Sequence, residues 1–362
     1  TSVGTLHTSP YGLSGQGIIV GIWEMATEVN HTDFGTRLTP ITIPFFEDYP
    51  EHMEYVCGIV GGDGTVSSGT YTGMAPSVAM YTYDLFHPNG PVYLPWIRYP
   101  DAINIQGVDV ATNSWVWDMH SGVYGGGALQ YDNIIRGSPS TPGIPIVWGA
   151  GNKNYPWYPP GPCHIPINNI TFGNITFGEY DCIGPPATAK NVITVGATHS
   201  NNDNIWDPTL TTGSSRGPTD DGRIKPDIVA PGCQQGGDNG ITSTYPINTY
   251  QSACGTSAAA PVVAGILALA MEFLDNNAYP RFIPSTYKAA LIHTAKDLGN
   301  PGPDFTYGYG RVQAVELIDL LATDAASGTH IIETSFNHNE TMNFTFNVSN
   351  SDPLVKVTMV WD

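Results

Sequence analysis

Basic residues are scarce in this sequence, and charge of either sign is low. The 362 residues include 13 Lys and Arg against 32 Asp and Glu, which gives a formal net charge of −19. An acidic surface repels a phosphate backbone, so we expect no nucleic-acid partner. Charged residues make up 12% of the chain, about half the usual share.

Long hydrophobic runs and internal repeats are also missing. No apolar run reaches the ~18 residues typical of a membrane span, and no repeat of ~20–50 residues is apparent. The chain begins without a recognisable leader, so we expect any targeting segment or pro-segment to have been removed or left out. Apolar residues account for 41% of the chain, enough for one large domain and part of a second. We expect a monomer.

Cysteine is rare, and its spacing is not that of a metal site. None of the five cysteines forms a C-x-x-C pair, so a zinc site is not expected. Cys163 and Cys182 bracket a Pro/Asn/Gly-rich stretch typical of a surface loop, which favours a disulfide between them. Cys233 and Cys254 are a candidate second pair, and Cys57 is expected to be a small buried residue. An extracellular setting is favoured by six Asn-x-Ser/Thr triplets, which begin at Asn30, Asn169, Asn174, Asn339, Asn343 and Asn347.

Short β-branched runs alternate with helical stretches from about residue 17 to residue 320. Residues 17–23 are apolar on both faces, as in a buried parallel strand, and similar runs cover 78–85, 108–115, 144–148 and 192–197. Helices are expected from Pro50 to about Gly61, and over 257–274, 285–297 and 311–321. This pattern predicts an α/β fold with a mostly parallel central sheet and helices on both faces. Reactive groups in such sheets gather at the carboxyl ends of the strands.

The pattern changes after about residue 325. Residues 331–348 and 355–361 alternate apolar and polar side chains, with no helix between them. This alternation predicts the start of an antiparallel β domain. We therefore place one domain at 1–324 and a partial β domain, truncated at its end, at 325–362.

The strongest local signal for chemistry is GTSAAAP at 255–261, followed by an apolar helix that must be buried. The Ser257 hydroxyl would lie at the positive end of the helix dipole, where a developing oxyanion is favoured. We place Pro261 within the first helical turn, where a missing backbone donor costs little. The alternative is that Ser257 only caps the helix. A nucleophilic serine also needs a base.

This stretch and other segments resemble, in the same order, the motifs of the subtilase family. HMEYVCGIVG at 52–61 resembles the family's histidine helix, and GTSAAAP resembles its serine signature. The other matching segments are GMAP at 73–76, TNSW at 112–115, GAGN at 149–152, SSRGP at 214–218, KPD at 225–227, APG at 230–232 and YGYG at 307–310. The resemblance covers about residues 15–320 and implies a subtilisin-like serine endopeptidase. The trailing β segment is similar to the subgroup with a C-terminal jelly-roll-like domain.

The resemblance implies a role for each of four residues. Ser257 is the nucleophile, His52 is the general base, and Glu24 occupies the position of the acid. Asn152 is the side-chain donor to the oxyanion, paired with the Ser257 N–H, although a turn residue is the alternative reading of Asn152. We expect a Glu24 carboxylate oxygen within about 3.2 Å of the imidazole nitrogen that faces away from Ser257.

The acid is the least typical part of this set, because most subtilases carry aspartate where this sequence has Glu24. Glu28 and Asp33 are the fallback acids, and the absence of any properly placed acid is also left open. His31 is given a structural role because it aligns with a non-catalytic histidine of the family. Met53-Glu54-Tyr55 replaces the usual Gly-Thr-His after the catalytic histidine.

The same resemblance implies where a peptide substrate binds. The primary pocket is lined by Ser114, Trp115 and Val116 on one side and by Trp148, Gly149, Ala150 and Gly151 on the other. Extended peptides would add to these segments as strands. Val116 stands where glycine is common, so its side chain would narrow a subsite or reposition the peptide.

The chemistry requires no cofactor, and structural calcium is frequent in the family. Asp220-Asp221 and residues 202–204 are oxygen-rich candidates, but their spacing assigns no ligand.

The sequence therefore predicts a secreted serine endopeptidase that acts on protein or peptide substrates through an acyl-enzyme. A catalytically impaired binding protein of the same fold is one alternative, motivated by the departures at Glu24 and Met53–Tyr55. A transpeptidase or macrocyclase is another, because amines also capture acyl-enzymes. The acidic sedolisin branch is a third, against which His52 and Asn152 argue.

Overall fold

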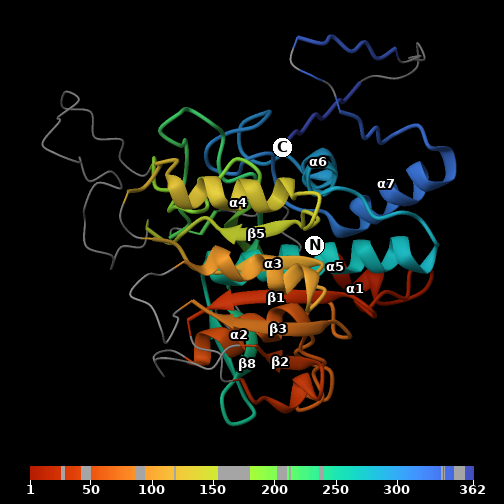
Figure 1. The fold of residues 1–362 in the computed structure, drawn as a ribbon. Helices are drawn as coiled ribbons and strands as arrows, with labels where there is room; N and C mark the ends of the chain where they lie inside the picture. The colour runs from red at the N-terminus through yellow and green to blue at the C-terminus, as the bar shows by residue number, and fades with distance from the viewer. Residues whose placement is uncertain are drawn as a thin grey trace, which may run out of the picture.

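Seven parallel strands form the central sheet of the chain (Figure 1). The computed structural model describes residues 1–25, 29–41, 50–85, 94–117, 120–153, 180–201, 210–211, 213–235, 240–335, 337, 339–345 and 355–362. The strand order is β2-β3-β1-β4-β5-β6-β7. The strands are β1 (Ile19–Glu24), β2 (Leu38–Pro40), β3 (Ala79–Asp84), β4 (Val110–Asn113), β5 (Ile146–Gly149), β6 (Ile193–Asn201) and β7 (Ile228–Gln235). The predicted fold class is confirmed.

The register of the sheet brings three strand ends together. Trp23 of β1 pairs with Asn113 of β4, and Asn113 pairs in turn with Trp148 of β5. Because the strands are parallel, the residues that follow these three positions lie at the same edge of the sheet. Glu24, Ser114 and Gly149 are those residues.

Helices cover both faces of the sheet. One buried cluster holds α2 (Pro50–Gly61) and α5 (Thr256–Asn276), and a second holds α3 (Tyr99–Asn104) and α4 (Gly126–Arg136). Strand β5 contributes to both clusters, since its successive side chains point to opposite faces: Val147 packs with the first and Trp148 with the second. The remaining helical elements are α1 (Val3–Leu6), η1 (Thr32–Phe34), η2 (Pro95–Arg98), α6 (Pro284–Thr294) and α7 (Ala314–Ser327).

Helix α5 is the central helix of the fold. It is long and apolar enough to cross a membrane, but 89% of its most apolar window is buried inside the protein. The prediction of a buried helix here is confirmed. The placement of Pro261 was wrong: α5 begins at Thr256, so Pro261 is its sixth residue and lies beyond the first turn.

One other expectation needs correction, and several elements were not predicted. The helix predicted over 311–321 begins only at Ala314, because Arg311 is extended and forms bridges with Lys296 and Val229. Helices α3 and α4 were not foreseen. Neither was the antiparallel hairpin of β8 (Ile241–Tyr245) and β9 (Thr249–Ala253), which leads directly to the serine turn.

The C-terminal region differs most from expectation. The described residues after α7 contain no strand, so the predicted strands over 331–348 and 355–361 are not formed there. Val355, Val357, Met359 and Trp361 are each more than half exposed. Alternation of apolar and polar residues stabilises a strand only where a second layer covers the apolar face. A domain boundary near residue 325 and a jelly-roll-like domain remain predictions.

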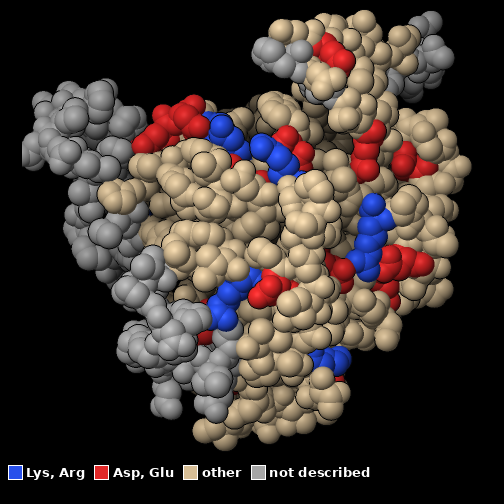
Figure 2. All heavy atoms as spheres, in the orientation of Figure 1, with Lys and Arg blue, Asp and Glu red and all other residues tan. Residues whose placement is uncertain are grey.

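The KPD segment forms a buried ionic cluster with α6. Asp227 accepts from Lys225 at 2.7 Å and from Lys288 of α6 at 2.8 Å, and all three side chains are buried. The Asp227 carboxylate also accepts the backbone N–H of Thr194 in β6 at 2.8 Å. The cluster therefore ties β6, β7 and α6 together. Elsewhere charge is sparse, and Figure 2 shows Asp, Glu, Lys and Arg in small separate groups on an otherwise uncharged face.

Candidate active site

Glu24 and His52 meet at the edge of the sheet where β1 ends. Glu24 Oε2 lies 3.0 Å from His52 Nδ1, within the distance expected from the sequence. Glu24 Oε1 accepts the backbone N–H of Ser114 at 2.9 Å. Both carboxylate oxygens are therefore used, and the Glu24 side chain is fully buried while that of His52 is 33% exposed. Glu24 can hold the imidazole by one nitrogen and leave the other free to act.

The environment of His52 favours its protonated form. Burial alone would lower the pKa of the imidazole, but the adjacent Glu24 carboxylate and its hydrogen bond outweigh burial, with a smaller contribution from Glu51. The net effect raises the pKa of His52 above its ordinary value of 6.5. A histidine whose neutral imidazole is available near neutral pH can accept a serine proton and return it to a leaving group.

Ser257 is the second residue of α5, and Gly255 rather than Ser257 is the cap. The backbone N–H of Ser257 therefore belongs to the first helical turn, whose donors have no partner within the helix. The Ser257 hydroxyl donates to the carbonyl oxygen of Ser114 at 3.2 Å. In this rotamer it is hydrogen-bonded to the main chain of the β4 extension and not to His52.

Pro261 explains a second contact between these two serines. In a regular helix, the N–H of residue 261 would donate to the carbonyl of Ser257, but proline has no N–H. The Ser114 hydroxyl takes its place and donates to the Ser257 carbonyl at 3.1 Å. Ser114 thus contacts both Glu24 and Ser257 and fixes the distance between strand end and helix start. Sequence reasoning placed Ser114 only in a pocket wall; the polar TNS run at the end of an apolar strand was the available signal.

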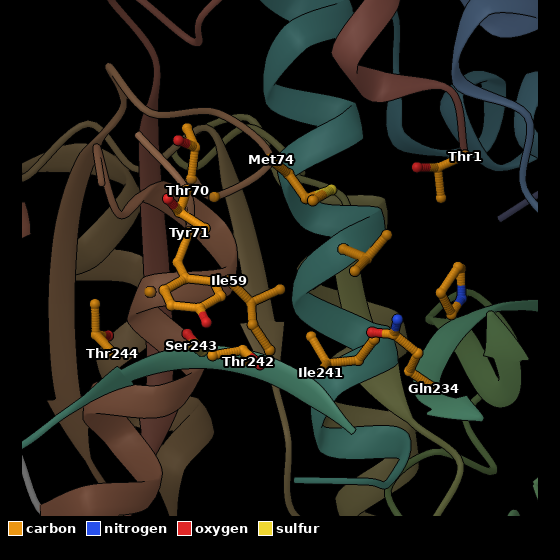
Figure 3. Close-up of a pocket in the computed structure, with 15 residues that line it drawn as sticks. Thr1, Ile59, Thr70, Tyr71, Met74, Gln234, Ile241, Thr242, Ser243 and Thr244 are labelled. Atoms are coloured by element: carbon orange, nitrogen blue, oxygen red, sulfur yellow. The ribbon is translucent and has the colours of Figure 1, made fainter. Parts of the chain in front are cut away.

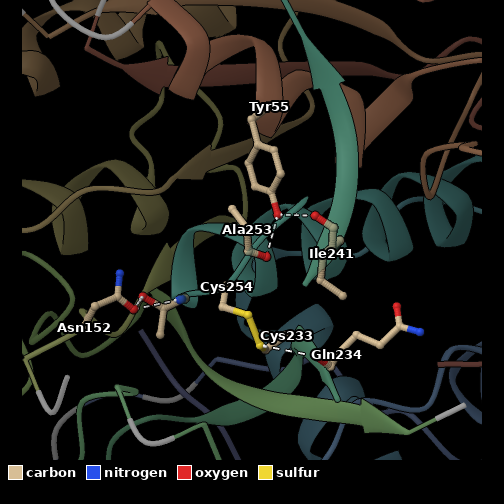
Figure 4. Close-up of a disulfide and its surroundings, with 8 residues drawn as sticks. Tyr55, Asn152, Cys233, Gln234, Ile241, Ala253 and Cys254 are labelled. Atoms are coloured by element: carbon tan, nitrogen blue, oxygen red, sulfur yellow. Dashed lines mark hydrogen bonds between the residues drawn. A yellow bond between two sulfur atoms is a disulfide. The ribbon is translucent and has the colours of Figure 1, made fainter. Parts of the chain in front are cut away.

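Asn152 lies beside the start of α5. Its Oδ1 accepts the backbone N–H of Thr256 at 2.9 Å and the Thr256 hydroxyl at 3.1 Å (Figure 4). Because Thr256 occupies the amide oxygen, the Nδ2 group is left to donate elsewhere. Gly255 has φ 157° and a Cβ there would lie 3.1 Å from Asn152 Nδ2, so glycine keeps this space open. Thr256 was not singled out from the sequence.

The segments predicted to line the substrate pocket lie on neighbouring strand ends. Trp148 is fully buried and Trp115 is 7% exposed, and their rings meet edge to face at 4.7 Å. Trp148 Nε1 donates to the Trp115 carbonyl. Both tryptophans belong to the buried cluster that holds α3 and α4, and not to the cluster that holds α5. Ser114 contacts Ser257, and the Gly151 N–H donates to the Thr256 hydroxyl at 3.2 Å. Val116 packs against the cluster that holds the two tryptophans, next to Gly151.

Comparisons with known proteins show to which family the chain belongs. The model of the subtilase family matches residues 15–310. The chain belongs to the subtilase family. It is 28% identical over 332 residues to serine protease AprX of Bacillus subtilis, covering 83% of this chain and 66% of AprX. It is 28% identical over 307 residues to subtilisin DY of Bacillus licheniformis, covering 83% and 90% of the two chains.

Solved structures agree on the fold of this subtilase. The Clostridium perfringens CspB protease superposes with a TM-score of 0.67 at 20% identity, covering 88% of this chain and 97% of that one. The prenylagaramide maturation protease PagA superposes with a TM-score of 0.59 at 19% identity, covering 83% and 93% of the two chains.

The rival residues of this subtilase are engaged elsewhere. Asp33 accepts the Tyr250 hydroxyl at 2.6 Å and the Val66 N–H at 2.8 Å. His31 Nε2 lies 3.1 Å from the Thr249 carbonyl oxygen, and its Nδ1 accepts the Asp33 N–H at 3.2 Å. Glu28, the other fallback acid, lies outside the described residues. Of the candidate acids described, Glu24 is the one in contact with His52.

Met53, Glu54 and Tyr55, which stand where the family usually has Gly-Thr-His, make structural contacts. Met53 is buried in the core. Burial raises the pKa of Glu54, although hydrogen bonds from the backbone N–H groups of Asn30 and His31 stabilise its charged form and offset part of this effect. The Tyr55 hydroxyl contacts the Ile241 carbonyl at 2.7 Å and the Ala253 carbonyl at 3.1 Å (Figure 4). Tyr55 thereby links the histidine helix to the hairpin that precedes Ser257.

A disulfide bond lies close in sequence to Ser257. Cys233 of β7 is disulfide-bonded to Cys254, three residues before Ser257, which confirms the second predicted pair. Cys182 is also disulfide-bonded, and its predicted partner Cys163 lies outside the described residues. Cys57 is a buried free thiol, as expected.

A cavity of about 290 Å³ lies apart from this site (Figure 3). It is bounded by α2, β8 and the 70–74 loop, and none of the four candidate catalytic residues lines it. Two of the hydroxyl groups that line the cavity are hydrogen-bonded to the backbone of α2: Ser243 donates to the Tyr55 carbonyl and Thr244 to the Glu54 carbonyl, both at 2.7 Å.

No calcium site is assigned among the residues that the structure describes. Within the described ranges, no group of three His, Cys, Asp or Glu side chains could hold a metal ion. Asp221 is paired with Arg223 at 2.9 Å, and the candidate segment 202–204 lies outside those ranges.

Proposed function

We propose that this subtilase is a serine endopeptidase in which Glu24 replaces the usual aspartate. The observation that carries the proposal is the Glu24–His52 hydrogen bond of 3.0 Å, at the sheet edge that also holds Ser114 and its partner Ser257. Ser257 Oγ attacks the substrate carbonyl carbon while His52 Nε2 takes its proton. His52 then returns that proton to the amine as the C–N bond breaks. In the second step, His52 takes a proton from water as the water oxygen attacks the acyl carbon, and returns it to Ser257 Oγ as the ester bond breaks.

Attack requires the Ser257 hydroxyl to change its hydrogen-bond partner. The hydroxyl that now donates to the Ser114 carbonyl must turn to His52, and this exchanges one hydrogen bond for another. Apo geometry of catalytic hydrogen bonds is commonly loose and tightens when substrate binds.

The oxyanion is bound by two donors in this proposal. Asn152 Nδ2 is free because Thr256 holds the amide oxygen, and the Ser257 N–H lies in the first turn of α5. Both donors are fixed before the substrate arrives, so stabilising the tetrahedral oxyanion needs little reorganisation. The helix dipole adds to the same effect.

An extracellular setting is part of the proposal. The Cys233–Cys254 disulfide favours an oxidising compartment. Asn30, Asn339 and Asn343, which begin three of the glycosylation triplets, are exposed. Substrates are proteins or peptides that bind in extended form, and the enzyme acts as a monomer without a cofactor.

A fluorophosphonate probe tests the mechanism. We expect covalent labelling at Ser257, located by mass spectrometry, and loss of labelling in His52→Ala and Ser257→Ala. A folded protein that is not labelled would support the binding-protein alternative. The product masses from a peptide substrate, with and without an added amine, separate hydrolysis from transpeptidation.

A further inference from the structure

Three segments lie next to one another near Ser257, joined by hydrogen bonds. The β4 extension at 114–117 is the first, since its Ser114 carbonyl accepts the Ser257 hydroxyl. The 149–152 turn is the second, since it ends at Asn152. The third is 183–185: Gly184 N–H donates to the Ala150 carbonyl at 3.3 Å, and Trp117 N–H donates to the Pro185 carbonyl at 2.8 Å.

Glycines on two of these segments face the Val116 side chain. A Cβ built on Gly184 would lie 2.6 Å from Val116 Cβ and 2.8 Å from its Cγ2. A Cβ built on Gly151 would lie 3.4 Å from the same Cγ2. Val116 therefore packs directly against both backbones, and its isopropyl group occupies the space that the two glycines leave.

This position matters for the substrate residue whose carbonyl is attacked. That carbonyl must lie between Ser257 and Asn152, so the side chain of the same residue extends between the 114–117 and 149–152 segments. Val116 already fills the gap there. The branched side chain is stiff about χ1, and the contacts with Gly184 and Gly151 leave it little room to turn away.

We infer that Val116 closes the acyl-side pocket, so that this enzyme cleaves after glycine or alanine and rejects large aliphatic and aromatic residues. The inference rests on the proposed function and names its substrate class. A difference of one methylene in an apolar pocket changes the specificity ratio by about 10- to 200-fold. A residue as large as leucine or phenylalanine would have to displace Val116 from a packed site.

Four peptide anilides that differ only in the acyl-side residue (Gly, Ala, Leu, Phe) test this. We expect the wild-type enzyme to have kcat/KM values for Gly or Ala at least 10-fold above those for Leu and Phe. In Val116→Gly, the ratio of Leu or Phe to Ala should rise by about 10- to 200-fold. Val116→Ala should lie between the two. Val66→Gly is the matched control, since Val66 is 40% exposed and lies on a separate loop, and its profile should equal that of the wild type.

The outcomes separate this inference from the proposed function. A small fluorophosphonate that labels Ser257 in every variant shows an intact mechanism, whatever the side-chain preference. A wild-type enzyme that labels and cleaves after Phe as well as after Ala overturns the role of Val116. So does a labelled Val116→Gly whose profile is unchanged. Failure of labelling in the wild type overturns the proposed function instead.

Discussion

Glu24 Oε1 accepts the Ser114 backbone N–H at 2.9 Å while its Oε2 contacts His52 at 3.0 Å. One carboxylate thus fixes both the base and the strand whose Ser114 carbonyl contacts the nucleophile. The position of β1 is set by its pairing with β3 and β4, so the length of the acidic side chain decides whether both contacts form.

Shortening this side chain should uncouple the two contacts. In Glu24→Asp the carboxylate recedes by about 1.5 Å, one C–C bond, and can no longer reach both partners. Loss of one hydrogen bond to a charged group, ~1.5–3 kcal/mol, predicts that kcat falls about 10- to 100-fold. Glu24→Ala should fall by about 10⁴-fold, as expected for a triad acid. Equal activity of Glu24→Asp and wild type in steady-state kinetics would contradict this reading.

The pH dependence of kcat/KM should report the His52 pKa. Activity needs the neutral imidazole, so it rises as pH increases through that pKa, and Glu24 raises the pKa above 6.5. In Glu24→Gln the pKa falls, and the acidic limb of the residual activity should shift to lower pH. Glu51→Gln serves as the control, with a smaller shift in the same direction. An identical acidic limb in Glu24→Gln and wild type would rule out this coupling.

Asn152 variants distinguish an oxyanion donor from a structural residue. Asn152→Ala removes Nδ2 and also the acceptor for Thr256. Asn152→Asp keeps the acceptor but lacks the donor. If donation to the oxyanion is its role, both variants should lose about 10²- to 10³-fold in kcat with little change in KM. Retained activity in Asn152→Asp alone would show that holding Thr256 is what counts.

Removal of the Cys233–Cys254 disulfide should destabilise the protein. The two cysteines are 21 residues apart, and closing a loop of this size contributes about 3 kcal/mol through the unfolded state. We expect Cys233→Ala/Cys254→Ala to lose about that much free energy of unfolding in a urea titration. Wild-type protein unfolded with a reductant present should lose at least as much, because the reductant also breaks the disulfide of Cys182, whereas Cys57→Ala, which keeps both disulfides, should unfold like the wild type when no reductant is present.

Much of the site could be predicted because its residues lie in short, characteristic runs. Ser257 stands between small residues and a buried helix, and His52 stands at the start of an apolar one. The helices α3 and α4 were missed because their apolar positions are few, and the β8–β9 hairpin because its run is polar. The C-terminal strands were predicted from alternation alone, which does not supply the layer that would cover them.

The sequence by itself determined the alternation of strands and helices, the order of the family's motifs and the residue types available for catalysis, because these depend on local composition and period. Only the tertiary structure decided that Glu24, and not Asp33, contacts His52, that Ser114 compensates for Pro261, and that Val116 packs against Gly184. Each of these depends on the register of the parallel strands and on segments up to 143 residues apart, and no local pattern fixes such distances.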